Sequence, residues 1–346
     1  MKWITAPANS TNVAALTAAL GVSRPVAQVL CARGLSDVIA ARRFLAPSPS
    51  DLHNPFLLAG MEAAARRLVS AIEHKEPILL YGDYDVDGTS ALVVLKKVLD
   101  MAGGMATCFV PHRIRDGYGM KSEAVEDAAA QGVKLIVSVD TGIRASQVVR
   151  HATGLGIDVI VTDHHLPEAE LPPAVAVLNP NRRDCTYPEK NLCGAGVALK
   201  LAEALMMTLQ WEPARRERLV DSLLKLVAIA TVADVVPLTG ENRVIVKRGL
   251  AGLDRVANVG LRALLDVAGV EAGTAPSARQ VAFQIAPRIN AAGRMASAGD
   301  IVDLFTTTDP ARARTIAAQL DDLNKDRRST EDGIQQAILE QCLAQP

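Results

Sequence analysis

Short apolar runs alternate with longer helical stretches through the middle of the chain. Each run has four or five residues, is rich in Val, Ile and Leu, and is followed by ten or more residues with helical spacing. Strands that alternate with helices predict an α/β fold with a mainly parallel sheet covered on both faces. The predicted strands are residues 78–81, 107–110, 135–139, 159–162 and 174–178.

The segments on either side of this pattern have helical periodicity. Residues 1–75 contain Ala- and Leu-rich stretches broken by Pro and Ser, and we expect a helical lead-in there. After Gly194 the chain is mostly helical, and residues 223–233 are apolar on nearly all sides, which predicts a buried helix ending at Asp234. The predicted divisions of the chain are residues 1–75, 76–236, 237–320 and 321–346.

Polar side chains follow nearly every predicted strand. In a parallel sheet, ligands bind at the carboxyl ends of the strands, where the connecting loops converge. We therefore expect these side chains to line one cleft. The segments that follow the strands are GDYDVDG (82–88), PHR (111–113), DTG (140–142), DHH (163–165) and NPN (179–181).

Four aspartates of this cleft would repel one another unless cations were bound beside them. Two divalent ions would balance their charge, and a mixed set of carboxylates and imidazoles suits Mn²⁺ or Mg²⁺ better than structural zinc. Two ions about 3.5–4 Å apart can clamp a phosphoryl group and generate hydroxide from water, so phosphoester hydrolysis is the expected reaction. The aspartates are Asp85, Asp87, Asp140 and Asp234.

Several of these segments also have other interpretations. DYDVDG resembles part of a calcium loop, but such a loop requires Glu six residues after the Gly, where this chain has Val94. Asp140 alone could cap a helix, and DTG also matches the dyad of aspartic proteases, which are all-β proteins. Residues 163–165 could form a solvated loop. An acid at a helix C-terminus, as at Asp234, is unfavourable by about 0.3–1 kcal/mol without a nearby cation.

Composition by itself argues mildly against a nucleic-acid binder. The 346 residues include 37 Lys and Arg against 38 Asp and Glu, a net charge of −1, with only 2 Trp, 4 Tyr and 5 Phe. Phosphate neutralisation and base stacking are therefore poorly supplied. Two divalent ions at the four aspartates would change the net charge to about +3.

The cysteines and the N-terminus predict a cytoplasmic location. The five cysteines form no CxxC pair, which fits a reducing compartment. The N-terminus has no basic and apolar leader, and no apolar run reaches the length of a membrane span. We expect no membrane partner.

Six long motifs follow one another along the chain: ILLYGDYDVDGTS, VPHRIRDGYGMKSEAV, LIVSVDTGI, the segment 159–202 that begins VIVTDHH, ATVADVVPLTGENR and APRINAAGRM. In this order and spacing they resemble the motifs of the RecJ single-strand-specific exonucleases in the DHH phosphoesterase superfamily. The resemblance implies the DHH phosphoesterase fold, a mainly parallel five-stranded sheet flanked by helices and followed by a mostly helical region. It also implies 5′→3′ hydrolysis of single-stranded DNA to mononucleotides with two Mn²⁺ or Mg²⁺ ions, in recombination and repair.

The resemblance also implies a metal-ligand set. In it, Asp140 bridges both ions. The family often has a histidine four residues before the first Asp of the pair, where this chain has Tyr81, so Asp83 could take over as a ligand. The implied ligands are Asp83, Asp85, Asp87, Asp140, His164 and Asp234.

Catalytic and substrate-binding roles follow from the same motifs. His165 matches the residue that contacts substrate or assists catalysis, and Asp163 is expected to orient the histidines. Arginine forks suit phosphate, so the candidate substrate contacts are Arg113 and three residues of an expected APRINAAGRM loop, Arg288, Asn290 and Arg294. Arg288 and Arg294 have an alternative role as ion-pair partners of the acidic cluster.

The family's DHH-associated domain and oligonucleotide-binding barrel have no counterpart in this sequence, so the expected unit is a catalytic core. Residues 321–346 resemble the start of the helix that leads toward the DHH-associated domain. One alternative is a DHH phosphodiesterase that acts on short oligonucleotides or cyclic dinucleotides. Another is an inactive RecJ-like scaffold, which is disfavoured because the expected metal ligands are present.

Overall fold

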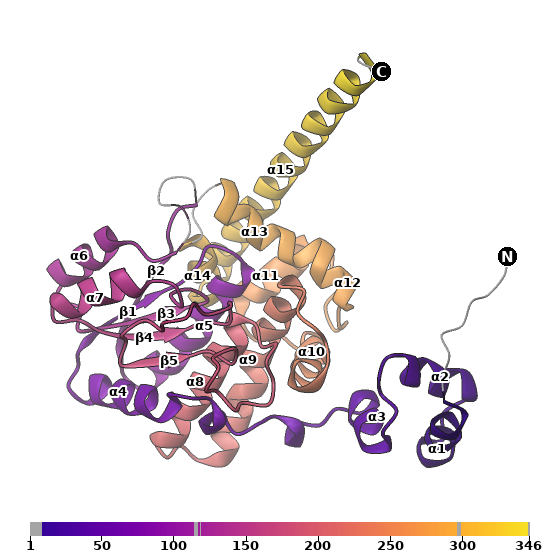
Figure 1. The fold of residues 1–346 in the computed structure, drawn as a ribbon. Helices are drawn as coiled ribbons and strands as arrows, with labels where there is room; N and C mark the ends of the chain where they lie inside the picture. Colours follow the sequence, from indigo (N-terminus) through magenta and orange to yellow (C-terminus); the bar gives the residue numbers. More distant parts are fainter. Residues whose placement is uncertain (1–8, 114–116, 118, 296–298, 345–346) are drawn as a thin grey trace.

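A five-stranded parallel sheet forms the centre of the protein (Figure 1). The computed structural model describes residues 9–113, 117, 119–295 and 299–344, without the side chains of residues 294, 295 and 344. The strand order is β2-β1-β3-β4-β5, and every pairing is parallel, which confirms the predicted α/β sheet. The strands are β1 (Pro77–Tyr81), β2 (Met105–Phe109), β3 (Leu135–Val139), β4 (Asp158–Thr162) and β5 (Ala176–Leu178).

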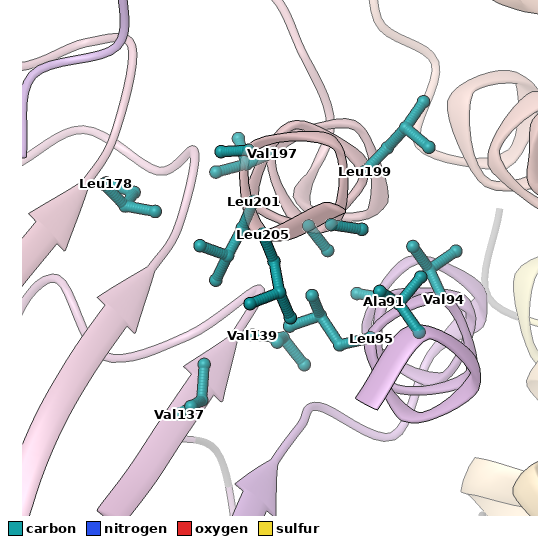
Figure 2. Close-up of a cluster of buried hydrophobic side chains, with 14 of the residues drawn as sticks. Ala91, Val94, Leu95, Val137, Val139, Leu178, Val197, Leu199, Leu201 and Leu205 are labelled. Carbon is teal, nitrogen blue, oxygen red and sulfur yellow. The ribbon is translucent and has the colours of Figure 1, made fainter. Parts of the chain in front are cut away.

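Side chains of the central strands alternate between two apolar cores, one on each face of the sheet. Ile78 and Leu80 of β1 belong to the core under α4, α5 and α8, whereas Leu79 and Tyr81 belong to the core under α6 and α7. Figure 2 shows the first core, where α5 and α8 cover β3. The covering helices are α4 (Met61–Glu73), α5 (Val86–Met101), α6 (Ser122–Ala130), α7 (Ser146–Gly154) and α8 (Gly194–Thr208).

A helical region follows the sheet and has its own apolar core. Val86 and Val93 of α5 also belong to this core, so α5 packs against both the sheet and the helical region. The last helix, α15, extends away from the body (Figure 1). The helices are α9 (Pro213–Ala233), α10 (Gly240–Gly252), α11 (Val259–Val267), α12 (Ala278–Gln280), α13 (Ala286–Met295), α14 (Gly299–Thr306) and α15 (Pro310–Ala344), with a π-helical segment, η3 (Val281–Ile285), between α12 and α13.

The first three helices form a separate small cluster with its own core. Arg243 and Lys247 of α10 donate hydrogen bonds to the carbonyl oxygens of Phe44 and Leu45, which attaches this cluster to the helical region. Among the described residues, no helix has the combination of length and apolar character required for a membrane span. The cluster and its connection contain α1 (Ser10–Leu20), α2 (Arg24–Ala32), α3 (Val38–Leu45), η1 (Pro49–Asp51) and η2 (Pro55–Leu57).

The predicted loop at residues 286–295 is wrong, because this segment is helix α13. Pro287 has no N–H to donate to the carbonyl of Phe283, and a proline inside a helix clashes with that carbonyl. The preceding turn is π-helical, which is one way a helix accommodates such a defect, and Arg328 of α15 donates to the Phe283 carbonyl oxygen instead at 3.4 Å. Tertiary contacts therefore compensate for the proline.

Candidate metal centre

The turn from β1 into α5 holds three aspartates in a tight conformation. Asp85 is the N-cap of α5, and its Oδ1 accepts hydrogen bonds from the N–H groups of Asp87 and Gly88 at 2.9 and 3.0 Å. Asp83 is buried and accepts a hydrogen bond from the N–H of Tyr84. A Cβ on Gly88 would lie 2.7 Å from Asp83, so the turn closes this tightly only with glycine there.

The N-terminus of α8 binds the carboxylate of Asp87. The N–H groups of Gly194 and Ala195 donate to its two oxygens at 2.6 and 2.8 Å, so the positive end of α8 stabilises this buried charge. A Cβ on Gly194 would lie 2.5 Å from Asp140, and glycine therefore allows α8 to meet the end of β3. That these two amides bind Asp87 was not predicted from the sequence. The available signal was a glycine at the start of an apolar helix.

Asp140, directly after β3, is a buried carboxylate with an unsatisfied oxygen. Its backbone is left-handed, with φ of 58°, and its side chain is almost fully buried. Within the described part of the chain, Oδ1 has no hydrogen-bond partner; Nε2 of His164 lies 3.1 Å away outside hydrogen-bonding geometry. The next helix begins at Ser146 with Ala145 as its N-cap, so the helix-cap interpretation of Asp140 is wrong.

Asp163, directly after the neighbouring strand β4, has partners for both oxygens. Oδ1 accepts from the N–H groups of His164 and His165 and contacts Nδ1 of His165 at 2.7 Å, while Oδ2 accepts from the N–H of Ile143 at 2.9 Å. This arrangement fixes the DHH segment on the end of the sheet, so the segment is not a freely solvated loop. It also orients the His165 ring toward the solvent-accessible side of the cluster.

Asp234 ends the buried helix α9, as predicted, and faces His164. Its Oδ2 lies 3.8 Å from Nδ1 of His164, whose Nε2 lies 3.7 Å from Oδ2 of Asp87. His164 is thus surrounded by carboxylates from three separate elements. The helix end provides no cationic side chain in its last turn.

Burial and mutual repulsion raise the pKa of most carboxyl groups in the cluster. Burial, followed by the charges of Asp87 and Asp85, raises the pKa of Asp140 well above its ordinary value and that of Asp234 to about 7. Burial and the charge of Asp85 raise the pKa of Asp83 to about 7. At neutral pH the cluster is therefore electrostatically strained without a cation.

Burial also opposes ionisation of Asp163, but the hydrogen bonds and charge of His165 outweigh it and lower the pKa of Asp163. The same hydrogen bond, against the effect of burial, raises the pKa of His165. Asp163 is therefore the stable anion of the site, and His165 is biased toward its protonated form.

Among the residues that the structure describes, three overlapping groups of side chains could hold metal ions, with the ligand atoms in each group within 4.8 Å of one another. Asp140 belongs to two of the groups, and so does His164. The unsatisfied oxygen of Asp140 and the mixture of carboxylate and imidazole donors both fit divalent cations. The groups are Asp83–Asp85–Asp140, Asp87–His164–Asp234 and Asp140–His164–His165.

The predicted substrate contacts have different partners in the structure. Arg113 follows β2, is exposed and lies over the ring of Tyr84 at 5.0 Å, beside the acidic cluster. Arg288 forms an ion pair with Asp321 of α15 at 2.7 Å, so its guanidinium does not pair with the acidic cluster. Oδ1 of Asn290 accepts a hydrogen bond from a backbone N–H of α5. The side chain of Arg294 lies outside the described residues.

A cavity of about 600 Å³ borders the cluster on the side of His165. Its walls include Asp163 and the start of α7, where Arg144 donates two hydrogen bonds to the carbonyl oxygen of Leu166. The site is thus an acidic cluster whose donors suit a divalent cation, and the adjoining cavity is large enough for a small organic group.

Comparison with known proteins agrees with this geometry. The family model for the DHH family, N-terminal domain, matches residues 77–231. The single-stranded-DNA-specific exonuclease RecJ of Bacillus subtilis (strain 168) is 40% identical over 95% of this chain and 40% of its own length. RecJ of Escherichia coli (strain K12) is 40% identical over 82% of this chain and 50% of its own length.

Two solved structures extend the match to three dimensions. The crystal structure of RecJ from Thermus thermophilus in complex with Mn²⁺ has a TM-score of 0.83 at 33% identity, covering 98% of this chain and 47% of that chain. A crystal structure of exonuclease RecJ bound to manganese has a TM-score of 0.75 at 37% identity, covering 82% of this chain and 70% of that chain. The chain belongs to the RecJ family. It spans between 40% and 51% of the length of the curated RecJ relatives compared.

Proposed function

We propose that this RecJ-family chain is the catalytic core of a metal-dependent exonuclease that hydrolyses single-stranded DNA from the 5′ end to mononucleotides. The observation that carries the proposal is the buried Asp140 carboxylate, whose Oδ1 has no hydrogen-bond partner among the described residues and whose side chain belongs to two ligand groups. RecJ relatives described as bound to Mn²⁺ and Mg²⁺ support these two ions as the cofactors. Their description as single-stranded-DNA-specific exonucleases supports the substrate.

The ligands proposed for two ions are Asp83, Asp85, Asp87, Asp140, His164 and Asp234, with Asp140 shared between the ions. When bound, such ions polarise a phosphodiester and lower the pKa of water, so that hydroxide is available at neutral pH. Asp163 holds the His165 ring through Nδ1 and keeps its other nitrogen directed away from that carboxylate. His165, with its raised pKa, is placed to donate a proton or hydrogen bond to a phosphate oxygen or leaving group.

Arg113 is the residue we propose to contact the DNA backbone, because its guanidinium is exposed beside the acidic centre. We also propose that Arg294 contacts phosphate, as the family motif implies. Residues 76–236 are proposed as the catalytic domain and residues 237–320 as its helical part. DNA recombination and repair in the cytoplasm is the proposed setting; the five cysteines, all free, are compatible with it.

Incubating the chain with Mn²⁺ and a single strand labelled at either end tests this function. We expect the 5′ label to appear early as a mononucleotide, while the 3′ label remains in progressively shorter fragments. EDTA should abolish the reaction. Cleavage of only a dinucleotide or a cyclic dinucleotide would favour the phosphodiesterase alternative, and no cleavage with intact Mn²⁺ binding would favour a scaffold.

A further inference from the structure

The first turn of α5 needs a hydrogen-bond acceptor that its own N-cap does not supply. Asp85 accepts from the second and third residues of the helix through Oδ1, and from Thr89 through its carbonyl oxygen. The remaining donor is the N–H of Val86, the first residue of the helix. It donates to Oδ1 of Asn290, 204 residues later in the chain, at 3.1 Å.

Helix α13, which carries Asn290, lies directly against the turn that contains the metal-ligand aspartates. A Cβ on Gly293 would be 2.3 Å from the carbonyl oxygen of Tyr84, so the helix and the turn meet with no side chain between them. Ile289 and Ala292 are fully buried in the same core as Val86. This packing leaves α13 little freedom to shift relative to the turn.

The long helix α15 also holds α13 in place through ion pairs. Nε and Nη2 of Arg288 bind Oδ1 of Asp321 at 2.9 and 2.7 Å, and Lys325 binds the other oxygen of Asp321 at 2.8 Å. Arg288 also donates to the carbonyl oxygen of Gln284 one turn earlier. The position of Asn290 is therefore set by an ion-pair network as well as by apolar packing.

We infer that Asn290 is a positioning residue for the metal centre rather than a contact to substrate. By binding the N–H of Val86, it completes the first turn of α5 and leaves the Asp85 carboxylate in the orientation that joins Asp83 and Asp140. Without this acceptor, the buried N–H of Val86 competes for the Asp85 carboxylate and draws that carboxylate away from Asp83 and Asp140. The inference rests on the proposed metal-dependent function.

The test compares Asn290→Ala with Asn290→Asp, which keeps an acceptor oxygen at the same place. We expect N290A to weaken Mn²⁺ binding about tenfold in calorimetric titration. Hydrogen exchange of the segment 82–90 should become faster at the Val86 amide. N290D should bind Mn²⁺ at least as tightly as the wild type, because its acceptor is retained and its charge is negative.

Asn258→Ala is a matched control in the same helical region. Asn258 caps α11 by accepting from the N–H of Leu261 at 2.8 Å and donates to the carbonyl oxygen of Phe305, away from the metal centre. N258A should lower the melting temperature without changing Mn²⁺ affinity. Gly293→Ala is a second variant that leaves Asn290 in place, and its Cβ should displace the Tyr84 carbonyl and weaken Mn²⁺ binding.

Wild-type Mn²⁺ affinity in folded N290A and G293A, or loss of affinity in folded N290D, would overturn the inference. Unchanged exchange of the Val86 amide in N290A would also overturn it. Absence of Mn²⁺ binding by the wild type is a different result, which contradicts the proposed function itself. If N290A does not fold, the N290D and G293A results decide in the same way.

Discussion

Strands β3 and β4 lie side by side and end in buried aspartates that have opposite surroundings. Asp163, after β4, accepts hydrogen bonds on both oxygens, and the balance of burial against its bonds to His165 lowers its pKa. Asp140, after β3, has an oxygen without a hydrogen bond from any described residue, and burial among other carboxylates raises its pKa. The same strand-end position thus holds one satisfied and one unsatisfied charge.

This difference separates a carboxylate that holds protein groups in place from one that is suited to bind a cation. A buried anion whose hydrogen bonds are all supplied by the protein is stable as it stands. A buried anion that lacks donors and faces other anions is costly unless a cation binds. We therefore propose that Asp140 binds metal and that Asp163 orients His165.

Replacing Asp140 should have the largest effect. Asp140→Asn keeps the shape and tolerates the left-handed backbone, but it removes the shared charge. We expect the cleavage rate to fall by about 1,000-fold, equivalent to roughly 4 kcal/mol, with the fold retained. The measurement is single-turnover cleavage of labelled single-stranded DNA, with circular dichroism as the control. Activity near that of the wild type would remove Asp140 from the metal site.

Replacing Asp163 should have a smaller effect on the rate and a larger effect on the fold. Asp163→Asn disturbs the charge-assisted hydrogen bonds to His165, and we expect cleavage to fall by about 100-fold. The free energy of unfolding should fall by about 1.5–3 kcal/mol, unlike that of D140N. Parallel urea titrations of the two variants measure this contrast. Equal stability losses in D140N and D163N would contradict the distinction between the two aspartates.

The carboxyl groups with raised pKa values and Asp163, whose pKa is lowered, predict opposite pH dependences of the free energy of unfolding in the metal-free protein. Asp83 and Asp234, like Asp140, have folded-state pKa values above the ordinary 3.8, about 7 for the first two, so the folded state binds more protons between about pH 4 and 7. The free energy of unfolding should therefore fall as the pH rises through this range, by on the order of 2 kcal/mol after solvent screening.

Asp163, whose pKa is lowered, instead contributes stability above its unfolded pKa that is lost as the pH falls toward its folded pKa. Urea titrations at several pH values, in EDTA and in Mn²⁺, measure both trends. D140N should reduce the fall in stability toward pH 7, and Mn²⁺ should offset it by about 2.7 kcal/mol at a concentration 100 times the Kd. Metal-free stability that rises steadily from pH 4 to 7 would be inconsistent with a strained acidic cluster.

The smallest expected effect is that of replacing Gly194, the first residue of α8, which lies against Asp140. Gly194→Ala places a Cβ 2.5 Å from Asp140, closer than side-chain atoms pack, and should displace the Asp140 side chain. We expect Mn²⁺ affinity to fall about tenfold, as measured by calorimetry. Gly154→Ala is the matched control, because a Cβ there meets nothing within 4 Å. An equal effect in both variants would show that the close approach is not important for metal binding.

The sheet and its carboxylates could be predicted because both depend on local patterns. Apolar runs with helices between them predicted the five parallel strands, which the structure confirms to within about two residues at each end. Since all strands run the same way, the residues after them meet at one edge. The proximity of Asp85, Asp140 and His164 could therefore be predicted without information about side-chain packing.

The helical region was harder to predict because its important contacts are distant in sequence. Residues 286–295 were expected to form a loop, but a π-helical turn and Arg328 accommodate Pro287 and the segment is helical. The polar side chains of this segment looked like substrate contacts. In the structure Arg288 binds Asp321, and Asn290 accepts a hydrogen bond from the N–H of Val86; only the tertiary structure reveals these two contacts.

Anomalous diffraction from crystals grown with Mn²⁺ is the most direct test of the metal centre. We predict two manganese peaks with the Asp140 carboxylate between them, and one bridging oxygen or both oxygens of Asp140 in contact with manganese. Asp163 should retain its hydrogen bonds and contact no ion. Manganese bound to Asp163 would contradict the proposed roles of the two aspartates. The absence of manganese at Asp140, in crystals grown from protein that cleaves DNA in solution, would also contradict them.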